Sequence, residues 1–170
     1  MLDELIRTRR TQKAYAPRPV APEILDELFE LARWAPNHHL TNPWRFRVLG
    51  PGALAALKAA AGSEAAAKLD RAPTLVAASA VQCGDDPVAD EEDRLAAANA
   101  VFIILLAAHE RGLGSYWRTP GVLRTAAGRA ACGIPDGEHV LGLIHLGNAR
   151  GPEKAPPERA PLDAFREYLT

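Results

Sequence analysis

RRTQKAY at residues 9–15 and APNHHLTNPWRF at residues 35–46 are the two stretches that decide what this chain can fold into and bind. The first places several cationic groups and a hydroxyl on a short stretch that leaves a helix. The second is a turn-rich loop of side-chain amides and imidazoles that runs into an aromatic strand. A dense group of cations suits a phosphate, and such a loop suits a heterocycle with many hydrogen-bonding edges. Together they indicate a phosphorylated cofactor, and we rank FMN first.

The composition excludes several classes of protein. The 170 residues are enough for one domain with a substantial core. A formal net charge of −1 provides no overall basic field for a nucleic acid. Cys83 and Cys132 lack the spacing of a zinc site or a disulfide framework, which favours a reducing compartment. The longest apolar run, residues 96–108, is too short to span a bilayer, and the N-terminus shows no apolar signal region. We expect a cytoplasmic protein that binds neither nucleic acid nor membrane.

Hydrophobic periodicity and turn residues predict an α+β fold, with a small sheet against long helices. Apolar residues that alternate, or run continuously between turn residues, predict strands at residues 44–49, 74–81 and 140–146. Helical spacing and capping residues predict helices at residues 2–7, 22–36, 53–69 with a break near Gly62, 90–111, and 119–132 with Thr119 as the N-cap. Residues 147–161 are rich in Pro, Gly and charge and are expected to form an arm. Residues 162–169 are expected to form a short helix or strand.

Two further features bear on partners and cofactors. The helix at residues 90–111 is apolar almost all round, which is typical of a helix buried on several sides, and a subunit interface is a natural place to bury it. The only approach to a Rossmann motif, at residues 112–114, follows a helix and has Trp117 in place of the third glycine, and no P-loop is present. A nicotinamide nucleotide is therefore expected to bind only transiently, over another redox group.

Four ordered motifs carry a family resemblance: RRT.KAY at residues 9–15, ARWAPNHHLTNPWRF at 32–46, LAAHERGLGSYWR at 106–118 and ERAPLDAF at 158–165. In this order, and from about residue 5 to the C-terminus, they resemble the nitroreductase family of FMN-dependent oxidoreductases, and a compact subgroup of it. The resemblance implies a single FMN-binding domain over residues 1–170 with a C-terminal arm at 147–170. It also implies a nitroreductase-like α+β fold, with a small central sheet flanked by helices, in an intertwined homodimer.

The phosphate side of the cofactor is assigned to the first motif. Arg9, Thr11 and Lys13 alternate, so in an extended stretch their side chains point the same way. The resemblance implies that these positions, with Arg10 beside them, bind the phosphate and the ribityl chain. It also implies that Arg159 brings a further arginine from the C-terminal arm. The alternative is a solvated basic turn, the commoner origin of such a charge run.

The ring side is assigned to two other motifs. The loop with His38 resembles the compact subgroup, so His38 is expected to contact the flavin, and Asn42 replaces the glutamine usual in the wider family. Leu40 stands where that family has asparagine, a departure that affects the ring contacts and the substrate range. Trp117, Arg118 and Thr119 match a Trp-Arg-Ser run near the flavin, and Arg118 could also steer an acidic substrate or NAD(P)H. The alternative for this run is a helix end followed by packed aromatic residues, and His109 and His145 are expected to be structural.

The resemblance implies an FMN enzyme that takes a hydride from NAD(P)H, which then leaves. A nitroaromatic or quinone would next enter the same pocket and take two electrons, which gives ping-pong kinetics. One subunit would supply residues 9–13, and the other part of the loop or the long helix. No catalytic side chain and no metal site are predicted. Two alternatives stay open: a flavoenzyme of the same scaffold with a specialised substrate, and a non-catalytic dimeric module that binds a flavin or nucleotide for storage or sensing.

Overall fold

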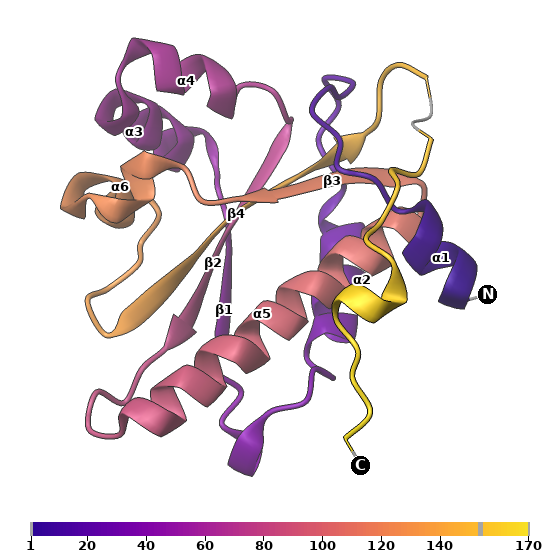
Figure 1. Cartoon of the computed structure of the whole chain (residues 1–170). Coiled ribbons are helices and arrows are strands. Elements are labelled where there is room, and N and C mark those ends of the chain that lie inside the picture. Colours follow the sequence, from indigo (N-terminus) through magenta and orange to yellow (C-terminus); the bar gives the residue numbers. More distant parts are fainter. Residues whose placement is uncertain (1, 153–154, 170) are drawn as a thin grey trace.

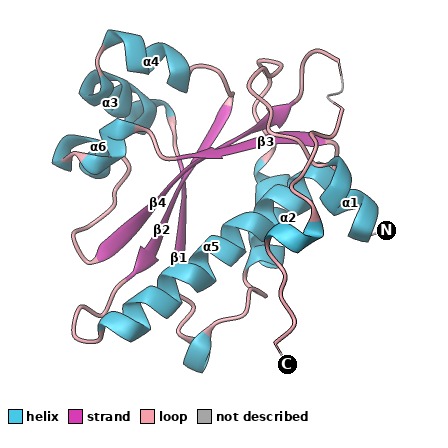
Figure 2. Ribbon diagram, viewed as in Figure 1, coloured by secondary structure: helices cyan, strands magenta, loops and turns pink. Residues whose placement is uncertain are grey.

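A four-stranded antiparallel sheet forms the centre of the computed structural model, which describes residues 2–152 and 155–169 (Figures 1 and 2). The strands lie in the order β1-β2-β4-β3, and each pair of neighbours is antiparallel. Their bounds are Trp44–Val48 for β1, Thr74–Val81 for β2, Leu113–Arg118 for β3 and Glu138–Asn148 for β4. The α+β fold with a small central sheet and flanking helices is therefore confirmed.

Helices cover both faces of the sheet. The described helices are α1 (Leu2–Thr8), α2 (Pro22–Ala32), α3 (Pro51–Ala61), α4 (Ser63–Leu69), α5 (Pro87–Glu110) and α6 (Ala126–Ala131). One apolar cluster joins α2 and α5 to the sheet, and a second joins α3 and α4 to the opposite face. Figure 2 shows α5 crossing the sheet on one side, with α3, α4 and α6 grouped on the other.

The central strand and the long helix follow directly from small apolar residues. The first seven residues of β2 are buried, as the continuous apolar run predicted. The buried side of α5 is also mostly alanine, so helix and sheet approach closely. Helix α5 begins three residues earlier than expected, because Asp86 accepts hydrogen bonds from the backbone N–H groups of Val88 and Ala89 and caps it. Among the described residues, no helix has both the length and the apolar character needed to cross a bilayer.

The stretch after α5 differs from the prediction. The sequence did not predict β3, because Gly112 and Gly114 suggested a turn; only Gly112 ends the helix, with φ 72°, and Gly114 lies inside the strand. The expected helix from Thr119 to residue 132 is wrong in its first half. A short 3-10 helix occupies Gly121–Arg124, and Thr125 caps α6 by accepting from Gly128 N. The Thr119 hydroxyl instead donates to the carbonyl of Leu141.

The segment after α1 and the start of the C-terminal arm meet beside β3. Residues 147 and 148 still belong to β4, and the chain then continues as an exposed arm with one 3-10 turn at Leu162–Ala164. Arg150 N donates to Ala14 O at 3.0 Å, and Ala16 N donates to Asn148 O at 2.8 Å. These bonds tie the start of the arm to the segment that follows α1.

Candidate functional site

The segment that follows α1 lies against the free edge of β3. Thr11 forms a bridge with Ser115, and Gln12 N donates to Ser115 O at 3.0 Å. A Cβ atom on Gly114 would lie 2.9 Å from the Gln12 Cγ atom, so only glycine allows this close approach. The RRTQKAY stretch is therefore fixed to the sheet by backbone contacts, which leaves its cationic side chains for other partners.

Three arginines gather where this segment meets the C-terminal arm. Burial lowers the pKa of the Arg9 guanidinium, and the positive charges of Arg10 and Arg159 lower it further. Arg10 folds back onto the chain and donates to the carbonyls of Arg7 and Arg9, but its Nε atom is buried without a partner. Within the described part of the chain, none of the three forms an ion pair with a carboxylate. The structure thus brings Arg159 to Arg9 and concentrates positive charge there.

A second group of residues continues from these arginines along one face of β3. The Lys13 Nζ atom lies 5.7 Å from the centre of the Tyr116 ring, and the Tyr116 ring lies 5.6 Å from that of His145. His145 is 1% exposed, and neither ring nitrogen has a hydrogen-bond partner in the described structure. Burial lowers its pKa to about 4, and the charges of Arg118 and Arg71 add to that effect. The imidazole is therefore neutral at neutral pH and lies beneath a cationic surface.

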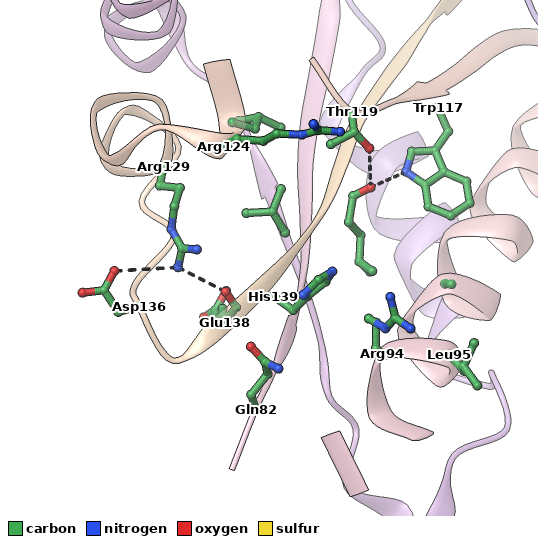
Figure 3. A pocket seen from close by; sticks show the side chains of 14 residues that line it. Gln82, Arg94, Leu95, Trp117, Thr119, Arg124, Arg129, Asp136, Glu138 and His139 are labelled. Atoms are coloured by element: carbon green, nitrogen blue, oxygen red, sulfur yellow. Dashed lines mark hydrogen bonds and ion pairs between the residues drawn. The ribbon is translucent and has the colours of Figure 1, made fainter. Parts of the chain in front are cut away.

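Strand geometry separates Arg118 from its two neighbours. Successive side chains of a strand point to opposite faces, so Trp117 and Thr119 lie on the side away from Arg118. Trp117 Nε1 and Thr119 Oγ1 both donate to Leu141 O, at 3.0 Å and 3.2 Å. Both side chains line a cavity of about 610 Å³ between α5, α6 and the start of β4 (Figure 3). The predicted run Trp117-Arg118-Thr119 therefore faces two different spaces.

The loop that carries His38 and Asn42 has a strained, well-connected backbone. Three residues of the loop have positive φ values, which residues other than glycine seldom adopt: 51° at His39, 53° at Leu40 and 48° at Asn42. Asn42 N donates to Asn37 Oδ1, and Asn42 Nδ2 donates to Leu40 O. Such strain is common at functional sites and persists only where the surroundings hold it.

This loop lies far from the arginines within one chain. His38 Nδ1 lies 2.9 Å from Glu92 Oε2 near the start of α5, whereas Thr8 Oγ1 lies 2.8 Å from His109 Nε2 near its end. These two contacts are about five helical turns apart, which corresponds to roughly 25 Å. The structure therefore does not bring His38 or Asn42 to the predicted phosphate residues of the same chain.

Comparison with known proteins identifies the family of this chain. The nitroreductase family model matches residues 6–68 and 60–148. The chain belongs to the nitroreductase family. A Haemophilus influenzae relative with the provisional name NAD(P)H nitroreductase is 31% identical over 184 residues, covering 98% of this chain and 96% of the relative.

Solved structures show the same nitroreductase fold. A nitroreductase-like family protein from Bacillus cereus superposes with a TM-score of 0.88 at 22% identity, covering 99% of this chain and 96% of that protein. A Desulfovibrio desulfuricans protein, described as a nitroreductase in complex with FMN, superposes with a TM-score of 0.81 at 23% identity, covering 99% of this chain and 98% of that one.

The donor set of this nitroreductase-family chain fits FMN. Arg9, Arg10 and Arg159 form a cation group without a carboxylate, and Arg10 Nε is a buried donor without a partner. A phosphate dianion accepts several such bonds. No cluster of three or more His, Cys, Asp or Glu side chains is placed to hold a metal ion in the described ranges.

The sequence missed three residues that the fold brings next to Lys13 and Arg118. Tyr116 alternates with Arg118 and could have been found once β3 was recognised. His145 lies opposite Tyr116 on β4, and Arg71 follows α4, so neither is near the motifs in sequence. His145 was expected to be structural; its burial agrees with that, but its unsatisfied nitrogens are unusual for a core residue.

Proposed function

We propose that this chain is an FMN-dependent oxidoreductase that carries two electrons from NAD(P)H to a small electrophilic acceptor, such as a nitroaromatic or a quinone, in the cytoplasm. The observation that carries the proposal is the group of Arg9, Arg10 and Arg159, held together without a carboxylate. A phosphate would neutralise this group. The FMN complex of the Desulfovibrio desulfuricans protein and the NAD(P)H in the name of the Haemophilus influenzae relative support the choice of cofactor and reductant.

Each residue has a physical role in this proposal. Arg9, Arg10 and Arg159 bind the phosphate with charge-assisted hydrogen bonds, and Thr11 and Lys13 extend the same surface. Arg118 and the backbone of Trp117 and Thr119 border the ring. When bound, FMN would supply the redox chemistry, taking a hydride from NAD(P)H and passing two electrons to the acceptor in a ping-pong cycle.

A homodimer would complete the site. Because His38 and Arg9 lie about five turns of α5 apart, one flavin could meet both only if a second copy supplied the loop. Exposed apolar side chains support a second copy: Phe102 on α5 is 43% exposed, and Phe165 and Tyr168 on the arm are 70% and 80% exposed. Surfaces of this kind typically mark an interface.

The first experiment is the visible spectrum of the purified protein, with identification of any chromophore released by heat. We expect a flavin spectrum, about one FMN per chain, and bleaching by NADH or NADPH without oxygen. The oxidised spectrum should return on addition of a nitroaromatic or quinone. A bound flavin that neither nucleotide reduces would favour a storage or sensing module. A colourless protein that does not take up FMN would contradict the proposal.

Mixing two variants tests the shared site. Arg9→Ala and His38→Ala each damage one half of it, so each homodimer should bind FMN weakly. If every site takes Arg9 from one copy and His38 from the other, one of the two sites in each mixed dimer has both wild-type residues. Random pairing makes about half of the dimers mixed, so wild-type binding returns at about a quarter of all sites. If both residues belong to the same copy, mixing restores none, and the dimeric site is wrong.

A further inference from the structure

The cavity beside Trp117 has a surface that the flavin proposal does not use. It has a volume of about 610 Å³, within the usual range for small-molecule sites. Trp117, Leu141 and Leu95 give it an apolar side (Figure 3). The indole is held in one orientation by its hydrogen bond to the Leu141 carbonyl. A flat apolar ligand therefore finds a fixed aromatic ring in this cavity.

The other side of the cavity carries arginines from three elements. Arg94 comes from α5, Arg124 from the 3-10 helix after β3, and Arg129 from α6 (Figure 3). Arg94 is paired with the exposed Glu91. Arg129 is held in place by the carbonyls of Pro135 and Glu138. Arg124 has no hydrogen-bond or ion-pair partner in the part of the chain that the structure describes.

The carboxylates of the cavity do not balance these charges. Glu138 is committed to Arg47, whose guanidinium donates to both carboxylate oxygens at 2.8 Å and 2.7 Å, and to the Ser79 hydroxyl. Asp136 is fully exposed and lies 3.9 Å from Arg129. Burial lowers the pKa of His139 on the same wall, and Arg94 and Arg129 lower it further while Glu91 opposes them. The cavity is therefore net positive around a neutral imidazole.

We propose that this cavity binds an aromatic carboxylate, at a site that the proposed flavin does not occupy. Trp117 contacts the aromatic ring. Arg124 and Arg129 bind the carboxylate, with Arg124 free to form the bidentate pair that guanidinium and carboxylate geometry favours. His139 adds an uncharged hydrogen-bonding group.

The test compares two ligands of similar shape and different charge by calorimetry. Benzoate carries a carboxylate where benzamide carries an uncharged amide. We expect benzoate to bind at least about tenfold more tightly than benzamide, the value of roughly one charge-assisted bond. Arg124→Gln should weaken benzoate binding about tenfold and leave benzamide binding nearly unchanged. Arg33→Gln, which changes an exposed arginine paired with Glu30 just after α2, should leave both affinities unchanged.

Titrations of the FMN-loaded and the flavin-free protein separate this inference from the proposed function. Because the cavity lies away from the proposed flavin residues, we expect benzoate to bind both forms with similar affinity. Benzoate binding that FMN abolishes would place the ligand in the flavin site and overturn the inference. Equal affinity for benzoate and benzamide, or no loss in Arg124→Gln, would overturn it as well and leave the proposed function intact.

Discussion

Arg47 and Arg9 occupy opposite electrostatic situations in the same molecule. Arg47 on β1 is fixed by the buried Glu138 carboxylate, with Ser79 as a third member, so one network joins three strands. Arg9 is half-buried beside two other arginines, and no described carboxylate pairs with it. A buried charge without a partner is unfavourable unless something else compensates it. Arg47 is thus a charge that the fold itself satisfies, whereas Arg9 is a charge that the fold leaves open for the proposed phosphate.

Breaking the paired arginine should give the largest effect. Glu138→Gln removes the negative charge and leaves the partly buried Arg47 guanidinium without it, so we expect the free energy of unfolding to fall by about 3 kcal/mol. Urea unfolding at fixed protein concentration measures this. Glu30→Gln breaks an exposed pair with Arg33 and should cost less than about 1 kcal/mol. A loss at Glu138 no larger than the loss at Glu30 would show that the network does not stabilise the fold.

Removing the unpaired arginine should give the opposite pattern. Arg9→Ala is expected to weaken FMN binding on the order of a hundredfold, because charge-assisted bonds to the phosphate are lost. The unfolding free energy of the flavin-free protein should stay the same or rise, since one of three mutually repelling cations is gone. Fluorescence titration with FMN and urea unfolding give the two values. Unchanged FMN affinity would return RRTQKAY to the solvated basic turn.

Much of the fold could be predicted because its elements are decided locally. The short apolar run at residues 74–81 predicts a strand, and the turn residue Gly62 predicts the break between two helices. β3 was missed because Leu113–Arg118 becomes a strand only by pairing with β4, and its two glycines suggest a turn. Pro120 after Thr119 predicts a helix cap at Thr119, but the hydrogen bond to the Leu141 carbonyl gives Thr119 a different role.

The candidate site was predictable only in part, for a related reason. Arg9 and Arg159 are brought together by an arm that leaves the sheet after β4, and only the family resemblance indicated that meeting. His145 and Arg71 come from separate elements, so no spacing in the sequence connects them to Arg118. The cavity arginines likewise come from three elements, so no spacing in the sequence connects them.

A pH series tests the lowered pKa of His145, whose buried ring nitrogens have no partner in the described structure. Its pKa is about 4 in the folded protein, below the usual value of 6.5, because of burial and the nearby arginines. The unfolded chain therefore takes up a proton that the folded chain does not. Stability should fall as the pH drops from about 6.5 to 4, by about 3 kcal/mol. The Glu138 carboxyl contributes in a lower window: burial alone raises its pKa, but hydrogen bonds from Arg47 and Ser79 outweigh that effect and lower it, so its contribution is lost only below about 4.5.

His145→Leu separates the two windows. The variant lacks this titrating ring, so its stability should fall less than that of the wild type between pH 6.5 and 4. The remaining slope comes from His139, whose pKa is also lowered by burial. Urea midpoints measured at several pH values in one buffer series show the difference. An equal slope in both proteins would mean that His145 is not the group that takes up the proton.

The smallest expected effect compares two arginines on the same arm. Arg159 acts on Arg9 and pairs with no described carboxylate, whereas Arg166 donates to Asp163 Oδ1 at 3.0 Å. Arg159→Gln should weaken FMN binding roughly tenfold, less than Arg9→Ala, because the exposed arm must lose conformational freedom to bring this guanidinium to the phosphate. Arg166→Gln should leave the affinity unchanged. The loss at Arg159 should also shrink as salt is added, since screening weakens the one contribution that the variant removes. If both variants weaken binding equally, the arm acts through its overall position and not through an arginine held without a partner, and the contrast between Arg47 and Arg9 would not extend to the arm.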